Sequence, residues 1–189
     1  IAQGDSIVAL ALTEPGRGTD AASIGLRAER SGDDWVLTGE KTSIMAAVYA
    51  THALVFARTG GPGPRGVTAF YVSLDDERVS RSPQSDLGCR SGGRGSIVFD
   101  RLRIASDAVV GEPGSGFVEV MRGFGVSRAL IALMAIAVGR AALDEAVTYA
   151  GRREAFGQPI GRFQSVAFPL VEHTTLLHAA RLVAYEALC

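Results

Sequence analysis

The sequence predicts an α+β fold, in which an antiparallel β-barrel or sandwich domain over residues 1–110 precedes the antiparallel helices of an incomplete helical bundle over residues 111–189. The first observation behind this prediction is a series of short β-rich runs, broken by turn residues, that extends to about residue 105. The second is a change of period after Ser115, where apolar residues recur at helical spacing. A chain of 189 residues is long enough to bury a core in either part.

Six runs in the first part are expected to be strands. The polar stretch SGDD at 31–34 separates the second run from the third and predicts a hairpin turn. The stretch TGGPGPRG at 59–66 is a loop by composition. Short strands at this spacing are typical of a barrel or sandwich. The expected strands are residues 7–12, 25–30, 35–41, 53–58, 67–73 and 96–104.

Two helices are expected in the second part. The first extends from about Ser115 to near Gly151 and is apolar almost all the way round, and the second follows a connector at 157–161. A helix that is apolar on every side needs partners on every side. Two helices cannot supply them, so we expect further helices from a longer protein or from other subunits. The longest apolar run, residues 129–138, is too short to span a bilayer, and we expect a buried helix and no membrane span.

Composition narrows the function classes. The chain is 47% apolar with a net charge of −1, which gives no support to broad nucleic-acid binding. Two cysteines make no disulfide framework and favour a reducing compartment, so we expect a cytoplasmic protein. Three histidines make no metal set, and no metal site is predicted. The chain begins without Met and ends at LVAYEALC, in what is expected to be mid-helix, which predicts an internal piece of a longer protein.

The choice of cation is unusual. Lys41 is the only lysine, against eighteen arginines. Codon bias is one explanation, and the use of arginine for phosphate recognition is the other.

The stretch LALTEPGRGTD at 10–20 raises the question of a ligand. A buried-strand pattern stops at Thr13 and continues into a Pro-fixed turn with two glycines, which lets a ligand approach the backbone. The stretch has no Gly-Lys-Ser/Thr ending and does not follow the Rossmann glycine pattern. Taken alone, the stretch is better explained as a surface loop.

Further motifs accompany it in a fixed order. They are GDDWVLTGEKTSI at 32–44, VVGEPGSGF at 109–117, SRALIAL at 127–133 and RREAFGQPIGRFQSV at 152–166. In this order the motifs resemble those of the acyl-CoA dehydrogenase family of flavoproteins, over nearly the whole chain. The resemblance implies the family's middle β-domain and the first two helices of its C-terminal helical domain, without the N-terminal helical domain and the last helices.

The resemblance implies FAD as the cofactor and assigns residues to it. Leu12 and Thr13 would meet the polar edge of the flavin, where fixed donors stabilise the charge that develops on hydride uptake. Gly18 and Thr19 would lie along the path of the CoA thioester, and Arg128 would lie beside the catalytic centre as a substrate residue.

Arg153, Phe156 and Gln164 match family positions that reach the FAD of a neighbouring subunit. A forked guanidinium suits a pyrophosphate. The alternatives are that Arg153 complements the dipole of its own helix and that Phe156 packs in a core. Because the whole motif matches, we favour the cofactor assignment.

Two further cofactor positions and the catalytic base depart from the family pattern. Ser43 stands where the family has Trp and Met45 where it has Thr; Met cannot donate a hydrogen bond, which predicts altered flavin redox behaviour and an atypical subfamily. The family's base is a Glu that lies beyond the position of Cys189 or directly before the matched arginine, where this chain has Ser127. We therefore name no residue of the chain as the base.

The predicted function is FAD-dependent α,β-dehydrogenation of an acyl-CoA thioester, as part of lipid metabolism, with this piece inactive alone. The resemblance implies an electron-transfer flavoprotein as electron acceptor and a homo-oligomer, a dimer or a homotetramer. One alternative is an acyl-CoA oxidase, which would form peroxide without an added acceptor. A second is a non-catalytic interaction module that keeps the fold. Acyl chain length cannot be inferred from these residues.

Overall fold

The structure is a computed structural model that describes residues 3–189. The chain divides into two compact units, Ile1–Val120 and Met121–Cys189. Helix α1 (Gly116–Arg152) belongs to both, because the boundary between the units lies inside it. The sequence predicted a domain boundary earlier, between residues 110 and 111.

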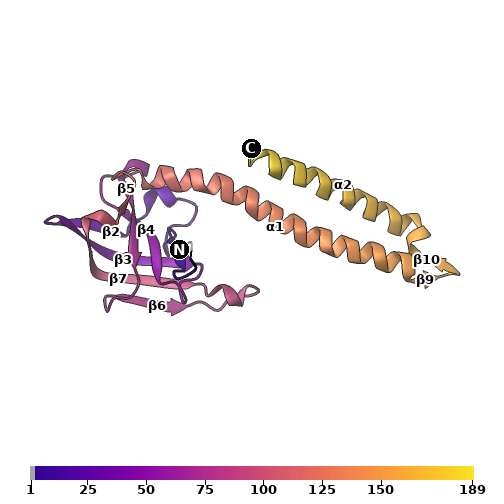
Figure 1. The fold of residues 1–189 in the computed structure, drawn as a ribbon, viewed down its shortest axis with the longest axis horizontal. Helices are drawn as coiled ribbons and strands as arrows, with labels where there is room; N and C mark the ends of the chain where they lie inside the picture. Colours follow the sequence, from indigo (N-terminus) through magenta and orange to yellow (C-terminus); the bar gives the residue numbers. More distant parts are fainter. Residues whose placement is uncertain (1–2) are drawn as a thin grey trace. The chain divides into compact units, whose positions relative to one another are not determined.

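The first unit is built on one eight-stranded sheet (Figure 1). Its strand order is β6-β7-β3-β2-β4-β5-β8, and β1 pairs with β4 beside this path. The strands are β1 (Val8–Ala11), β2 (Arg27–Ser31), β3 (Asp34–Ile44), β4 (His52–Arg58), β5 (Val67–Ser73), β6 (Val79–Pro83), β7 (Gly95–Ile104) and β8 (Val109–Val110). Short 3-10 helices lie at Ala21–Ser23, Pro64–Gly66, Arg90–Gly92, Ser106–Ala108 and, in the second unit, Ile160–Arg162.

The sheet differs from the prediction in two ways: it is open, and it contains parallel strand pairing. It is not closed into a barrel, since β6 and β8 end the strand order. It is also mixed, because β1 pairs in parallel with β4, with Val8 opposite His52. Parallel strands need a long connection, and here the β2–β3 hairpin lies within that connection. The remaining long ladders are antiparallel, as predicted.

All six predicted strands are present, and their bounds shift by a few residues. The predicted hairpin turn is confirmed: Ser31 pairs with Asp34, and Gly32 between them has φ +65°, which glycine adopts without strain. The sequence analysis missed β6, an exposed edge strand with the sequence VSRSP. A single apolar residue at one end of this strand gives no alternation to detect.

The core of the first unit follows from period-2 alternation. Along β3, Trp35, Leu37 and Lys41 are buried, and the residues between them are half-buried or exposed. Trp35 packs edge-on against Phe70 of β5, with ring centroids 5.4 Å apart. The inward face of β3 therefore carries one charged side chain among apolar ones.

The glycine-rich segment before α1 fixes the start of that helix on β5. Gly114, at φ +85°, donates its N–H to the Thr68 hydroxyl at 2.9 Å. Gly116 lies against the β5 backbone so closely that a Cβ there would be 2.6 Å from the nitrogen of Ala69. Glycine at this position allows the helix to begin in contact with the sheet.

The second unit is a helical hairpin, in which α1 and α2 (Gln164–Glu186) lie side by side and antiparallel (Figure 1). Strands β9 (Glu154–Ala155) and β10 (Gln158–Pro159) form a small hairpin between them. A Cβ at Gly139 would be 3.1 Å from Leu177, so the helices approach closely there. The predicted helix bounds are confirmed, except that α2 ends at Glu186 instead of continuing to the C-terminus.

The surface of α1 is strongly apolar. It contains an 18-residue window of mean hydropathy 1.7, so α1 is long and apolar enough to cross a membrane. A single helix of this kind is weak evidence that the protein spans a membrane. The sequence analysis counted only the uninterrupted apolar run of residues 129–138, which ends before Gly139, whereas the 18-residue window tolerates glycine and up to two charged residues. Large side chains of α1, among them Met134 and Val138, are exposed in this unit.

Candidate cofactor and substrate site

The exit of β1, residues Leu12–Glu14, is held against β3 by main-chain oxygens. The backbone N–H of Thr42 donates to the carbonyl of Thr13 at 2.9 Å, and the Lys41 ammonium donates to the carbonyl of Leu12 at 2.9 Å. Leu12 is buried and Thr13 is half-buried. Within residues 3–189, the Thr13 hydroxyl has no hydrogen bond, so it remains available as a donor at a fixed position.

A buried ion pair lies beneath this exit. Lys41 Nζ and Glu14 Oε1 are 2.9 Å apart, and their side chains are 0% and 8% exposed. The same carboxylate accepts the backbone N–H groups of Gly25 at 2.6 Å and Leu26 at 2.8 Å. The pair thus connects three segments, namely the β1 exit, β3 and the chain leading into β2.

The ion pair shifts the pKa of both partners. Burial lowers the pKa of Lys41 to about 8, although the charge of Glu14 opposes this effect; Arg58 lowers it further. Burial alone would raise the pKa of Glu14, but the N–H groups of Gly25 and Leu26 and the Lys41 charge outweigh it and hold that pKa below its usual value. Glu14 is therefore ionised at neutral pH and is fully hydrogen-bonded.

The end of β3 carries the two predicted cofactor residues that depart from the family pattern. Ser43 is exposed, at φ +56°, a conformation that costs a non-glycine residue about 1–3 kcal/mol. Met45 is also exposed, and its sulfur lies over Gly92, where a Cβ would be 2.5 Å away. The N–H of Ala46 donates to the Gly92 carbonyl at 2.8 Å and holds this turn.

The predicted substrate residues of the first unit lie just beyond the β1 exit. Glu14 and Arg17 exchange two backbone hydrogen bonds, of 3.1 and 3.0 Å, which close a tight turn. Gly18 and Thr19 follow this turn, and both are exposed. A Cβ at Gly18 would meet nothing within 4 Å, so the backbone there is open to a ligand.

Arg128 belongs to the second unit. Its side chain is exposed on α1, and its guanidinium lies 5.8 Å from the centre of the Phe124 ring. The hydroxyl of the preceding Ser127 donates to the Phe124 carbonyl at 3.3 Å. The Ser127 hydroxyl is therefore bonded within its own helix, and the position before Arg128 carries no carboxylate.

The remaining predicted cofactor residues lie where α1 meets the β9–β10 hairpin. The Arg153 backbone is held at both ends, by N–H to the Tyr149 carbonyl and by its carbonyl to the Ile160 N–H, both at 2.8 Å. Its side chain is exposed and has no ion pair in the described part of the chain. Gln164, exposed, begins α2.

Phe156 lies at the tip of the same hairpin. It is 96% exposed, at φ +52°, and its ring forms a T-shaped pair with Phe163, at 6.1 Å between centroids. Core packing within this unit is therefore excluded as its role. An exposed ring in a strained turn, close in sequence to an unpaired Arg153, fits a residue that serves a ligand outside its own unit.

The structure brings the predicted residues together in two groups. Leu12, Thr13, Ser43 and Met45 belong to the β1 exit and the end of β3, whereas Arg153, Phe156 and Gln164 belong to the α1–α2 connection. Sequence reasoning missed the roles of Glu14 and Lys41. The signal was present, because alternation along β3 places Lys41 on the inward face, where a charge needs a partner.

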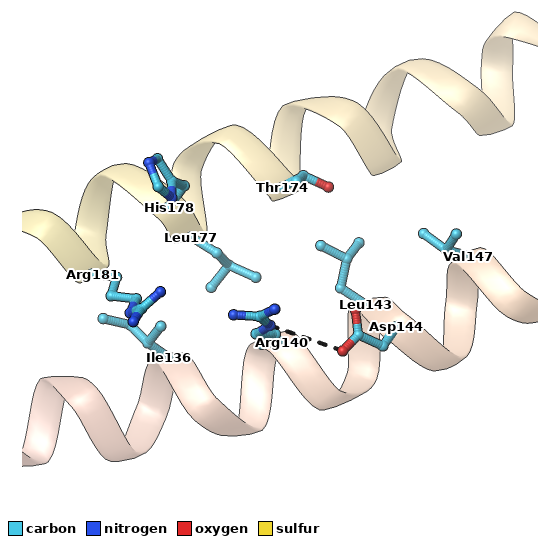
Figure 2. Close-up of a pocket in the computed structure, with 9 residues that line it drawn as sticks. All are labelled: Ile136, Arg140, Leu143, Asp144, Val147, Thr174, Leu177, His178 and Arg181. Atoms are coloured by element: carbon cyan, nitrogen blue, oxygen red, sulfur yellow. Dashed lines mark ion pairs between the residues drawn. The ribbon is translucent and has the colours of Figure 1, made fainter.

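The groove between α1 and α2 contains neither a buried ion pair nor a predicted site residue. Its volume is about 220 Å³, and Figure 2 shows the side chains of Leu143, Leu177 and Arg140 directed into the space between the helices. Its ion pair, Arg140–Asp144, is long at 4.0 Å and exposed. None of the predicted site residues lines it. The lining residues are Ile136, Arg140, Leu143, Asp144, Val147, Thr174, Leu177, His178 and Arg181.

Among the described residues, no group of three or more His, Cys, Asp or Glu side chains could hold a metal ion. Cys89 and Cys189 are free and exposed.

Comparison with protein families matches residues 9–102 to the middle domain of acyl-CoA dehydrogenases and residues 114–188 to their C-terminal domain. The chain belongs to the acyl-CoA dehydrogenase family. This is a family of flavoproteins and of oxidoreductases that act on CH–CH bonds. The resemblance read from the motifs is therefore confirmed.

Individual relatives agree. The mitochondrial short-chain specific acyl-CoA dehydrogenase of Bos taurus is 38% identical over 97% of this chain and 45% of its own length. The caffeyl-CoA reductase-Etf complex subunit CarC of Acetobacterium woodii is 36% identical over 99% of this chain and 50% of its own length. The structure of butyryl-CoA dehydrogenase from Megasphaera elsdenii has a TM-score of 0.92 at 30% identity, with 97% of this chain and 49% of that chain covered. The chain spans about half the length of the relatives it matches.

Proposed function

We propose that the protein containing this chain is an FAD-dependent enzyme that removes hydrogen from the α and β carbons of an acyl-CoA thioester. The observation that carries the proposal is the β1 exit, where β3 binds two carbonyls and the Thr13 hydroxyl, at a fixed position, has no hydrogen-bond partner among residues 3–189. A flavin ring needs such a fixed donor along its polar edge.

The residues present fit FAD in both units. In the first, the Thr13 hydroxyl and the exposed backbone near Gly18 suit the ring and the thioester path. In the second, the unpaired guanidinium of Arg153 suits a pyrophosphate, which it would bind with two parallel hydrogen bonds. FAD, when bound, supplies the group that accepts the hydride. The chain's own residues would bind and orient the FAD and the thioester. We assign the general base to a Glu outside these residues.

The assembly follows from Arg153 and Phe156. Both are exposed, Arg153 directly before the β9–β10 hairpin and Phe156 at its tip, so we propose that they serve the FAD of a second subunit in a dimer or homotetramer. Oligomer contacts would also cover α1. We therefore propose that its apolar surface packs against protein and that it does not span a membrane. We further propose an electron-transfer flavoprotein as the acceptor and a cytoplasmic location.

The test is an FAD titration of the intact protein and of its Arg153→Ala variant. Charge-assisted hydrogen bonds contribute about 1.5–3 kcal/mol, so a loss of affinity of roughly tenfold or more is expected. A matched control is Arg152→Ala, because Arg152 is the exposed neighbour that ends the same helix. Equal FAD affinity in all three proteins would contradict the assignment, and sedimentation of the loaded protein as a monomer would contradict the proposed assembly.

The reaction is tested with acyl-CoA substrates and an artificial electron acceptor. Turnover that requires the acceptor supports a dehydrogenase, and peroxide formed without it indicates an acyl-CoA oxidase. A protein that binds no FAD and remains colourless would instead be a non-catalytic interaction module.

A further inference from the structure

Lys41 is the only lysine in a chain whose other eighteen cationic side chains are arginine, and it is fully buried. Its ammonium fits between the Leu12 carbonyl and the Glu14 carboxylate, at 2.9 Å from each. Such a site suits a compact point charge, whereas the planar guanidinium of arginine is wider and carries five donors that would need partners. Among the cationic residues, lysine therefore stands at the position whose surroundings suit an ammonium better than a guanidinium.

We propose that the Glu14–Lys41 ion pair is a positioning device that fixes the β1 exit for cofactor binding, an inference that rests on the proposed function. The pair itself does not touch the ligand. It acts through the backbone of Leu12 and Thr13, which the hydrogen bonds of Lys41 to the Leu12 carbonyl and the Glu14 carboxylate hold in place.

The contacts around the exit support this role. Three consecutive residues of the exit are each bound to β3: Leu12 and Glu14 by Lys41, and Thr13 by the N–H of Thr42. A loop that is already ordered loses less conformational freedom when it binds a ligand. The exit therefore presents the Thr13 hydroxyl without the cost of ordering it at the moment of binding.

The energetics of buried ion pairs also favour a positioning role over a purely stabilising one. Desolvation of two charges offsets much of their attraction, and apolar replacements of whole pairs are often neutral or stabilising. A buried pair is thus weak evidence for stability. Glu14 and Lys41 instead define a geometry, because their four hydrogen bonds to the Leu12 carbonyl, to each other and to the N–H groups of Gly25 and Leu26 determine how three segments meet.

The experiment compares variants of the intact protein. They are Lys41→Met, Lys41→Arg and the double variant Glu14→Gln/Lys41→Met, with Arg103→Met as a control that breaks the exposed Arg103–Asp34 pair on the same sheet. We measure the FAD dissociation constant, the unfolding temperature and, in the FAD-free protein, hydrogen exchange of the amides at 12–14 and 25–26.

Lys41→Met and Lys41→Arg are expected to raise the dissociation constant for FAD about tenfold or more, and Arg103→Met to leave it unchanged. The double variant separates positioning from stability. Removing both charges is expected to restore most of the unfolding temperature. Because the Leu12 carbonyl still lacks its donor, exchange at 12–14 is expected to stay fast and FAD binding to stay weak.

Two outcomes overturn the inference alone: wild-type protein that binds FAD while the Lys41 variants bind it equally well, or a double variant that regains FAD affinity together with its stability. The second would show that the pair only stabilises the fold. Wild-type protein that binds no FAD would overturn the proposed function and this inference with it.

Discussion

The two units of the chain bury their side chains to very different degrees. In the first unit, Phe70, Phe99 and Lys41 are buried to within 1% of full enclosure. In the second, the side chains buried among residues 121–189 are three alanines, Ala129, Ala150 and Ala184. The first unit thus completes its own core. The second exposes the kind of apolar surface that proteins usually bury.

The same contrast governs the charges. The first unit keeps the Lys41 ammonium fully buried and the Glu14 carboxylate 8% exposed, and both are hydrogen-bonded, as buried charges need to be. In the second unit, the described Arg140–Asp144 pair is about 70% exposed on both sides and contributes little. Precise polar geometry is therefore a property of the first unit, and exposed apolar surface is a property of the second.

The largest expected effect compares two phenylalanines. Phe70→Ala is expected to lower the free energy of unfolding by about 3–5 kcal/mol, because it removes a fully buried ring that packs against Trp35. Phe168→Ala, at a ring that is 62% exposed on α2, is expected to cost less than about 0.5 kcal/mol in the 189-residue chain. Urea unfolding of both variants measures the difference.

The intact protein sharpens this comparison. There the cost of Phe168→Ala is expected to approach that of Phe70→Ala if other helices or subunits cover α2. A cost that stays small in the intact protein would show that this face of the second unit remains exposed, and the contrast between the units would then not arise from missing contacts.

The second effect is the pH dependence of stability. In the folded chain, burial lowers the pKa of Lys41 from 10.5 to about 8 against the opposing charge of Glu14, and Arg58 adds to the lowering. Between pH 8 and 10.5 the unfolded chain therefore binds more protons than the folded one. The free energy of unfolding is expected to rise with pH across this interval, by about 3 kcal/mol at 1.4 kcal/mol per pKa unit.

Denaturant unfolding at several pH values checks this, with Lys41→Met as the variant in which the rise should vanish. At acid pH the slope has the same sign, because the pKa of Glu14 is lowered in the folded chain: its contribution to stability is fully present above pH 4.5 and is lost as the pH falls through the folded-state pKa. A wild-type curve that stays flat between pH 8 and 10.5 would contradict the lowered pKa of Lys41 in the folded chain.

Alternation and turn chemistry were enough to predict six of the eight strands of the first unit, all but β6 and β8. The SGDD turn and the inward face of β3 follow from local rules, and both are present. The parallel pairing of β1 with β4 could not be predicted, because it depends on which distant segments meet, and β6 carries no alternation. The two helices were predicted from periodicity, but the exposed state of their apolar residues depends on partners that no pattern within the chain specifies.

The candidate site divides in the same way. Motif resemblance named Thr13, Arg153 and Phe156, and whether they bind FAD remains a prediction. It did not name the Glu14–Lys41 pair, although both residues lie inside the quoted motifs. The pairing is a contact between residues 27 positions apart, which needs the fold to bring them together. A rule that asks for the partner of every inward-facing charge would have found it.

The smallest expected effect uses two glycines of the same helix, one in each unit. Gly116→Ala is expected to lower the free energy of unfolding by about 1–3 kcal/mol, because the new Cβ would lie 2.6 Å from the backbone of Ala69. Gly123→Ala meets nothing within 4 Å and is expected to stabilise the 189-residue chain by about 0.5–1 kcal/mol through helix propensity. If another element covers α1 at Gly123 in the intact protein, the sign of the second effect should reverse there. Thermal unfolding of both variants in both forms distinguishes the two cases, and a stabilisation that persists in the intact protein would place this turn of α1 at an exposed surface.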